Sequence, residues 1–96
     1  MATRSGIALE AEYRVREMLL FVVHCLVDHP DQTEIELCCD SEGSVFCLRA
    51  HPADVGKLTE NGGRIEKALR CIVLASGRKL GRQLTVEIAE QTGPSN

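Results

Sequence analysis

The strongest constraint on the fold is the regular alternation of apolar and polar side chains in three short segments, residues 33–39, 44–50 and 83–89. Alternation with a period of two indicates strands that bury one face and expose the other. The polar residues 40–43 predict a turn between the first two strands. The side chains expected on the buried face are Ile35, Leu37, Cys39, Phe46, Leu48, Ala50, Leu84, Val86 and Ile88.

A long helix is predicted over Glu10–Asp28, ended by Pro30, because proline disfavours helix at the residue before it. Its second half is apolar almost all round, although a helix on one face of a small domain buries only a stripe. The additional apolar residues indicate either a self-association surface or contact with a neighbouring helix of the same chain. The expected stripe is Ala11, Val15, Met18, Leu19, Val22 and Leu26, and the apolar residues outside it are Leu20, Phe21, Val23 and Val27.

Two further helices are predicted between the second and third strands. His51–Asp54 opens a short one, with proline at the first helical position, and the other spans Arg64–Ser76, capped by Gly77 and followed by a basic loop at 78–82. The predicted fold is α+β, with a three-stranded sheet covered on one face by three helices in the order α-β-β-α-α-β. The residues expected to face the core from these helices are Val55, Leu58, Ile65, Ala68, Leu69, Ile72 and Ala75.

A chain of 96 residues has room for one domain, which we expect at residues 10–90, with flexible ends at 1–9 and 91–96. The aromatic fraction is 3%, so the core must be aliphatic. The longest apolar run, Met18–Val27, is too short to span a bilayer, which needs about 20 residues, and no secretory signal is recognised. These features predict a cytoplasmic protein without a membrane partner.

The five cysteines lie at positions 25, 38, 39, 47 and 71, without a C-x-x-C spacing. This spacing predicts neither a disulfide framework nor a zinc site. We expect reduced thiols packed as small apolar side chains. Two of them, Cys38 and Cys47, are expected with Val45 on the exposed face of the sheet, as a small apolar patch.

Positive charge is concentrated in one part of an acidic chain. The net charge is −3, yet residues 56–82 hold seven Lys and Arg against two Glu. Such a segment can present a local phosphate-facing patch, and it can equally be a solvated helix face.

Three strings together resemble the small single-KH-domain RNA-binding proteins of bacteria, the KhpA/YlqC type. They are "LVDHPD" at Leu26–Asp31, "DVGKL" at Asp54–Leu58 and "GRIEKALR" at Gly63–Arg70. The resemblance covers about residues 10–90 and implies a type II KH fold. In KH domains a G-x-x-G loop between two helices clamps the backbone of about four nucleotides.

The corresponding loop in this chain is Glu60–Gly63, in which Gly63 matches the second family glycine and Glu60 replaces the first. A carboxylate at this position repels phosphate, so we expect weak binding, micromolar or poorer, and strongly dependent on salt. Gly62 can allow the loop to shift by one residue. The RNA-binding residues that the resemblance implies are Lys57, Asn61, Gly62, Gly63, Arg64 and Lys67, with Val55, Leu58 and Leu69 as candidates for lining the base groove.

Two functions therefore remain open. The first is a module that binds single-stranded RNA, with RNA chaperone activity as the corresponding role. The second is a degenerate KH domain that acts only in protein association, through Glu10–Asp28 or the patch with Cys38. The resemblance also implies a homodimer or a complex with a larger KH-containing protein.

An enzyme is not expected. His24, His29 and His51 form no set of nucleophile, base and orienting residue, and the glycines form no phosphate-binding G-K-[ST] motif. We therefore predict no catalytic residue, metal, cofactor or small-molecule substrate.

Overall fold

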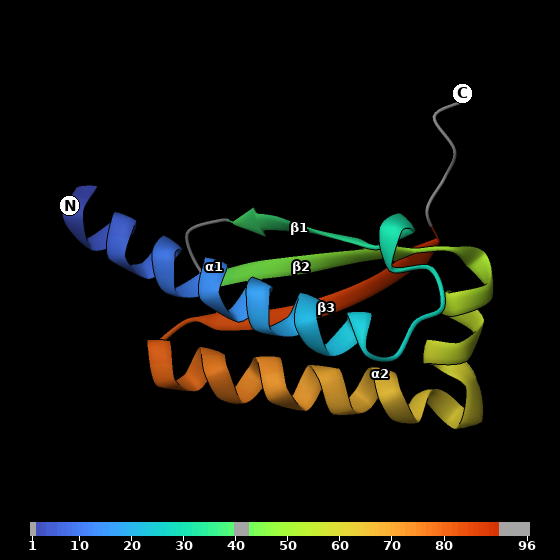
Figure 1. Ribbon diagram of the computed structural model, residues 1–96. Coiled ribbons are helices and arrows are strands. Elements are labelled where there is room, and N and C mark those ends of the chain that lie inside the picture. The colour runs from blue at the N-terminus through green and yellow to red at the C-terminus, as the bar shows by residue number, and fades with distance from the viewer. Residues whose placement is uncertain (1, 40–42, 91–96) are drawn as a thin grey trace.

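The computed structural model describes the backbone of residues 2–39 and 43–90, and their side chains from Glu10 onward. The elements follow the order α1 (Ala2–His24), a 3-10 turn η1 (Pro30–Gln32), β1 (Glu34–Cys39), β2 (Gly43–Ala50), α2 (Pro52–Leu80) and β3 (Gln83–Glu90). Both α-helices lie on the same side of the sheet (Figure 1). None of the helices described is both long and apolar enough to cross a membrane.

The sheet has the order β1-β2-β3. β1 pairs antiparallel with β2, with Leu37 opposite Phe46, and β3 pairs parallel with β2, with Val86 opposite Phe46. A parallel pair needs a long crossover connection, and α2 provides it. The alternation therefore predicted the strands and most of their inward faces, since Phe46, Leu48 and Val86 are fully buried, whereas Cys39 was expected to be buried and is exposed. The predicted turn residues 40–42 lie outside the described residues, and Gly43 belongs to β2.

The prediction of three helices is met in part: residues 52–80 form one helix, α2, which residues 60–63 with non-helical backbone divide into two segments, and the predicted basic loop is helical as far as Leu80. Gly77 is not the cap: a Cβ at Gly77 would lie 2.6 Å from the carbonyl oxygen of Arg82, so this glycine allows β3 to approach the helix closely. The helix continues to Leu80, and Gly81 caps it with φ 71°. The expected order is otherwise found, and the fold is α+β.

The first helix differs from its predicted limits. α1 begins at Ala2 rather than Glu10 and ends at His24 rather than Asp28. Residues 25–27 continue as hydrogen-bonded turns, and the backbone N–H groups of Asp28 and His29 donate instead to the carboxylate of Asp54. That tertiary contact ends the helix several residues before Pro30. The predicted flexible end at 91–96 lies outside the described residues.

The buried faces of the two helices are rotated relative to prediction. Val23 and Val27, placed outside the apolar stripe, are buried in the core, whereas Met18 is exposed. On α2 the core contacts are made by Leu69 and Val73, and the residues wrongly expected to be buried are Ala68, Ile72 and Ala75. Each helix carries apolar side chains on more than one side, so the 3.6-residue period alone did not show which side is buried.

The cysteines are also not core residues. All five are free; Cys25, Cys38, Cys39 and Cys71 are exposed, and Cys47 is partly buried. Cys25 lies in the turn after α1, Cys71 on α2, Cys38 and Cys47 on β1 and β2, and Cys39 at the end of β1, where its Sγ donates to Glu12 at 3.7 Å. The core is left to the branched aliphatic residues and Phe46.

A buried ion pair joins α1 to the start of the sheet. Glu12 is 1% exposed and accepts hydrogen bonds from Arg82 Nε at 2.6 Å and Ser44 Oγ at 2.6 Å. Arg82 also donates to the carbonyl oxygen of Gly43 and to Ser44 Oγ, each at 3.2 Å. These contacts connect the N-terminal half of α1 with the first residues of β2 and with the residue preceding β3.

Candidate nucleic-acid interface

The helix α2 is interrupted by four residues with non-helical backbone. Glu60 is extended, with φ −70° and ψ 171°, and the next three residues all have positive φ: Asn61 at 56°, Gly62 at 72° and Gly63 at 74°. Glycine adopts this left-handed conformation without steric strain, and asparagine is among the residues that tolerate it best. The sequence Asn-Gly-Gly therefore produces a sharp turn between two helical segments, where a G-x-x-G loop was expected (Figure 1).

The loop has one open and one enclosed glycine. A Cβ added to Gly62 would meet nothing within 4 Å, so a ligand can approach its main chain closely. Gly63 is buried, and a Cβ added there would lie 3.1 Å from Oε1 of Glu66. The Glu66 carboxylate also accepts a hydrogen bond from Arg70 at 2.8 Å, which compensates its charge.

The three predicted cations differ in how freely they can bind a phosphate. Arg64 and Lys67 are exposed in the turns that follow the loop. Lys57, in contrast, donates from Nζ to Oδ2 of Asp28 at 2.8 Å. This hydrogen bond raises the pKa of Lys57 above its ordinary value, and the nearby carboxylate of Glu60 acts in the same direction. A phosphate therefore has to compete with Asp28 for this ammonium group.

A carboxylate clamp, which we define as Asp54 with Asp28 and His29, fixes the first turn of α2 against the chain after α1. Asp54 is fully buried and accepts hydrogen bonds from the backbone N–H groups of Asp28 and His29 and from Nδ1 of His29, each at 3.0 Å. Burial alone raises the pKa of Asp54, but these donors outweigh it and lower the pKa below its ordinary value. The ring of His29 also stacks on His51, whose Nδ1 accepts from the N–H of Ala53. Sequence reasoning missed this clamp, although both its strings were recognised as part of the resemblance.

The three residues considered for a base groove also differ in exposure. Leu58 and Leu69 are buried in the core, at 0% and 2% exposure, and cannot contact a base without rearrangement. Val55 is partly exposed and is the one of these three that a base can reach without rearrangement.

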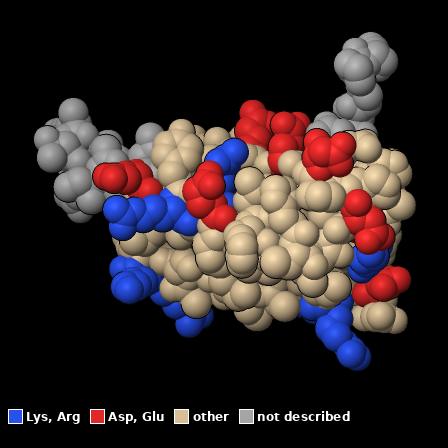
Figure 2. All heavy atoms as spheres, viewed as in Figure 1, with Lys and Arg blue, Asp and Glu red and all other residues tan. Residues whose placement is uncertain are grey.

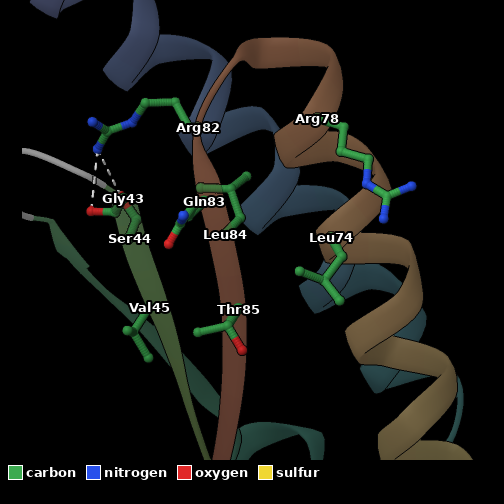
Figure 3. A pocket seen from close by; sticks show the side chains of 9 residues that line it. All are labelled: Gly43, Ser44, Val45, Leu74, Arg78, Arg82, Gln83, Leu84 and Thr85. Atoms are coloured by element: carbon green, nitrogen blue, oxygen red, sulfur yellow. Dashed lines mark hydrogen bonds between the residues drawn. The ribbon is translucent and has the colours of Figure 1, made fainter.

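A hollow of about 450 Å³ lies about three helical turns beyond the loop, between the end of α2 and the start of β3. Figure 3 shows Leu74 pointing toward β3, while Arg78 points away and Arg82 points toward Gly43. No sequence pattern indicated this hollow. Its lining residues are Gly43, Ser44, Val45, Leu74, Arg78, Arg82, Gln83, Leu84 and Thr85.

Charged side chains are distributed unevenly over one face of the molecule. In Figure 2 the centre of the face over the two helices is largely uncharged, Lys and Arg predominate along the lower margin, where α2 runs, and Asp and Glu predominate along the upper margin and at the right-hand end. The basic segment of the sequence thus forms one side of this face.

Comparison with known proteins identifies relatives along most of the chain. The chain is 40% identical over 65 residues to "RNA-binding protein KhpA" of Aquifex aeolicus, covering 68% of this chain and 82% of the relative. It is 32% identical over 76 residues to the protein of the same name in Halalkalibacterium halodurans, covering 79% of this chain and 100% of the relative. The corresponding protein of Clostridium perfringens is 31% identical over 74 residues, covering 77% of this chain and 99% of the relative.

No family model and no solved structure matches the chain. The resemblance inferred from the three strings is nevertheless confirmed by the curated relatives, which are matched over at least 82% of their own lengths in the three cases above. The chain therefore belongs to the KhpA family of small bacterial RNA-binding proteins.

Proposed function

We propose that this protein is a type II KH module that binds single-stranded RNA at Glu60–Gly63 and the helix start that follows. The observation that carries the proposal is the run of three left-handed residues, which opens the main chain between two helical segments. Support for the KH assignment comes from the parallel pairing of β2 and β3 around the interrupted helix, and from the RNA-binding names of the relatives.

The chemistry follows from the loop. Helix starts leave N–H groups without intrahelical acceptors, and together with the helix dipole they favour an anion. With Gly62 open, a phosphate can approach these groups, while Arg64 and Lys67 contribute positive charge from the following turns. A KH loop contacts the backbone of about four nucleotides, and we expect the same number here.

The test is fluorescence anisotropy with a labelled single-stranded RNA of mixed sequence, measured over a range of salt concentrations. We expect micromolar or weaker affinity, because Glu60 opposes phosphate. We expect a slope of log K against log salt of about −1.4 from Arg64 and Lys67, since each neutralised phosphate of a single strand contributes about −0.7, and of about −2 where a phosphate displaces Asp28 from Lys57. Double-stranded RNA of the same sequence is the control. Absence of binding at low salt would contradict the proposal.

Replacing Glu60 should strengthen binding. Glu60→Gly removes both the side chain and its charge, and we expect up to about tenfold tighter binding at low salt, which corresponds to about 1.4 kcal/mol. Glu60→Gln keeps the size and removes the charge, so it separates repulsion from steric obstruction. Unchanged affinity in both variants would show that RNA does not contact this loop.

A second candidate function is self-association through the helical layer. The observation favouring it is the exposure of large apolar side chains on the helices: Phe21 is 70% exposed, Tyr13 49%, Ile72 41% and Met18 36%. Large apolar side chains that are exposed to water on one layer of a small domain favour an interaction surface. A second copy of the chain, presenting the same uncharged face, is the occupant we propose.

Light scattering at tens of micromolar protein should then report twice the chain mass of 10.5 kDa. Phe21→Glu should return the mass to that of a monomer, because it places a charge in the apolar contact. Leu74→Glu is the matched control, since Leu74 is 48% exposed but lines the hollow beside β3. A monomeric wild-type protein would overturn this candidate.

A further inference from the structure

The face of the sheet opposite the helices carries a pair of thiols that RNA binding does not use. Cys38 on β1 and Cys47 on β2 have their Sγ atoms 4.0 Å apart. In the register Cys38 lies opposite Val45 and Cys47 lies opposite Glu36, so the two cysteines are diagonal neighbours on one face. We propose that Cys38 and Cys47 form a two-thiolate binding site for the soft monovalent cation Cu(I).

The spacing suits a bridging ion better than a disulfide. Diagonal residues of an antiparallel pair have Cα atoms about 7–8 Å apart, whereas disulfides usually need about 4.4–6.8 Å. Metal–sulfur bonds of about 2.3 Å allow two sulfurs on one ion to be separated by up to about 4.6 Å. The observed 4.0 Å falls within that limit. One ion therefore fits between the thiols without movement of the strands.

The number of ligands selects the metal. Structural zinc takes four protein ligands, and iron–sulfur clusters are usually held by four cysteines. Among residues 2–39 and 43–90 there is no group of three or more His, Cys, Asp or Glu that could hold an ion. Thiolates select soft metals, and Cu(I), a soft ion with a filled d shell, forms stable complexes with only two sulfur ligands.

Binding is a proton exchange without a change of oxidation state: two thiols and Cu(I) give a bis-thiolate with one negative charge and two protons released to solvent. Arg49, on the same face, compensates part of that charge, whereas the carboxylate of Glu87 repels it. Arg49 also donates to Glu36 at 2.9 Å. Burial, Cys38 and Glu87 raise the pKa of Cys47. Since the thiolate is the form that binds a metal, Cu(I) has to displace both thiol protons, and binding should strengthen as the pH rises.

The experiment is an anaerobic titration of the reduced full chain with Cu(I) supplied as its bicinchoninate complex, which loses colour as the protein takes the metal. We expect the wild type and the triple variant Cys25→Ser/Cys39→Ser/Cys71→Ser to withdraw one equivalent each. Adding Cys38→Ser or Cys47→Ser to the triple variant should weaken binding by at least about tenfold, because a single thiolate remains.

Circular dichroism of each variant provides the folding control. If the triple variant is not folded, the comparison is made in the wild-type chain, where Cys38→Ser should lose the equivalent and Cys71→Ser should keep it. Retention of tight binding by either variant of the pair would overturn the proposal, as would a folded triple variant that withdraws no copper.

Discussion

Replacement of Gly63 by aspartate should abolish detectable RNA binding, a loss of at least about 100-fold, or about 2.7 kcal/mol. The new carboxylate would stand at the start of the helix, where phosphate is proposed to bind. The Cβ of the new side chain would lie 3.1 Å from Oε1 of Glu66, so the loop would bring two carboxylates close together. Anisotropy titration against the same labelled RNA measures the effect.

The control is Gly63→Asn, which has the same shape and the same tolerance of positive φ but no charge. We expect Gly63→Asn to weaken binding by much less than Gly63→Asp. If both variants unfold, the same pair at Gly62 replaces them, because a Cβ there meets nothing within 4 Å. Equal affinity of the aspartate and asparagine variants at both glycines would contradict phosphate binding by this loop.

The largest expected effect on stability comes from Glu12→Ala. The change leaves the guanidinium of Arg82 without its partner at 2.6 Å, inside a cluster that also contains Ser44. Breaking a buried ion pair from one side costs about 3–5 kcal/mol. Because the side chain of Arg82 is 20% exposed, we expect the lower value of about 3 kcal/mol, which lowers Tm by roughly 12–24 °C in a domain of this size.

Thermal unfolding followed by circular dichroism tests this expectation. Glu10→Ala is the matched control, since Glu10 is exposed and pairs with Arg14 only at 3.9 Å, an arrangement worth at most about 1 kcal/mol. The double variant Glu12→Leu/Arg82→Leu should recover much of the loss, because two apolar groups leave no unpaired charge. A Tm for Glu12→Ala within the range of the Glu10 control would show that the ion pair is not needed.

The strands could be predicted because their alternation is local. Leu37, Phe46 and Val86 each occupy the phase that the sequence assigned, and the register then places Phe46 opposite both of the others. The helices could not be predicted as well, since their limits depend on distant contacts. From the local sequence Gly77 resembles a helix cap, yet its role in the structure is to allow β3 to approach α2 closely.

The same distinction between local patterns and distant contacts applies to the candidate site. The loop could be located because Asn61, Gly62 and Gly63 are consecutive and each of these residue types tolerates positive φ. The pairing of Lys57 with Asp28, 29 residues away, depends on how the chain after α1 docks on α2, and no local pattern encodes it. The same docking buries Asp54, whose charge alone would have suggested an exposed residue.

The exposed acidic side chains of β1 affect how the protein behaves in concentrated solution. Glu34 and Glu36 are exposed on an edge strand and face Arg49 of the neighbouring strand. Another copy adding its own β1 alongside would bring rows of glutamates together, and charges on an edge strand oppose such stacking. This edge is therefore protected against fibrillar aggregation, and growth of sheets from chain to chain would have to begin elsewhere.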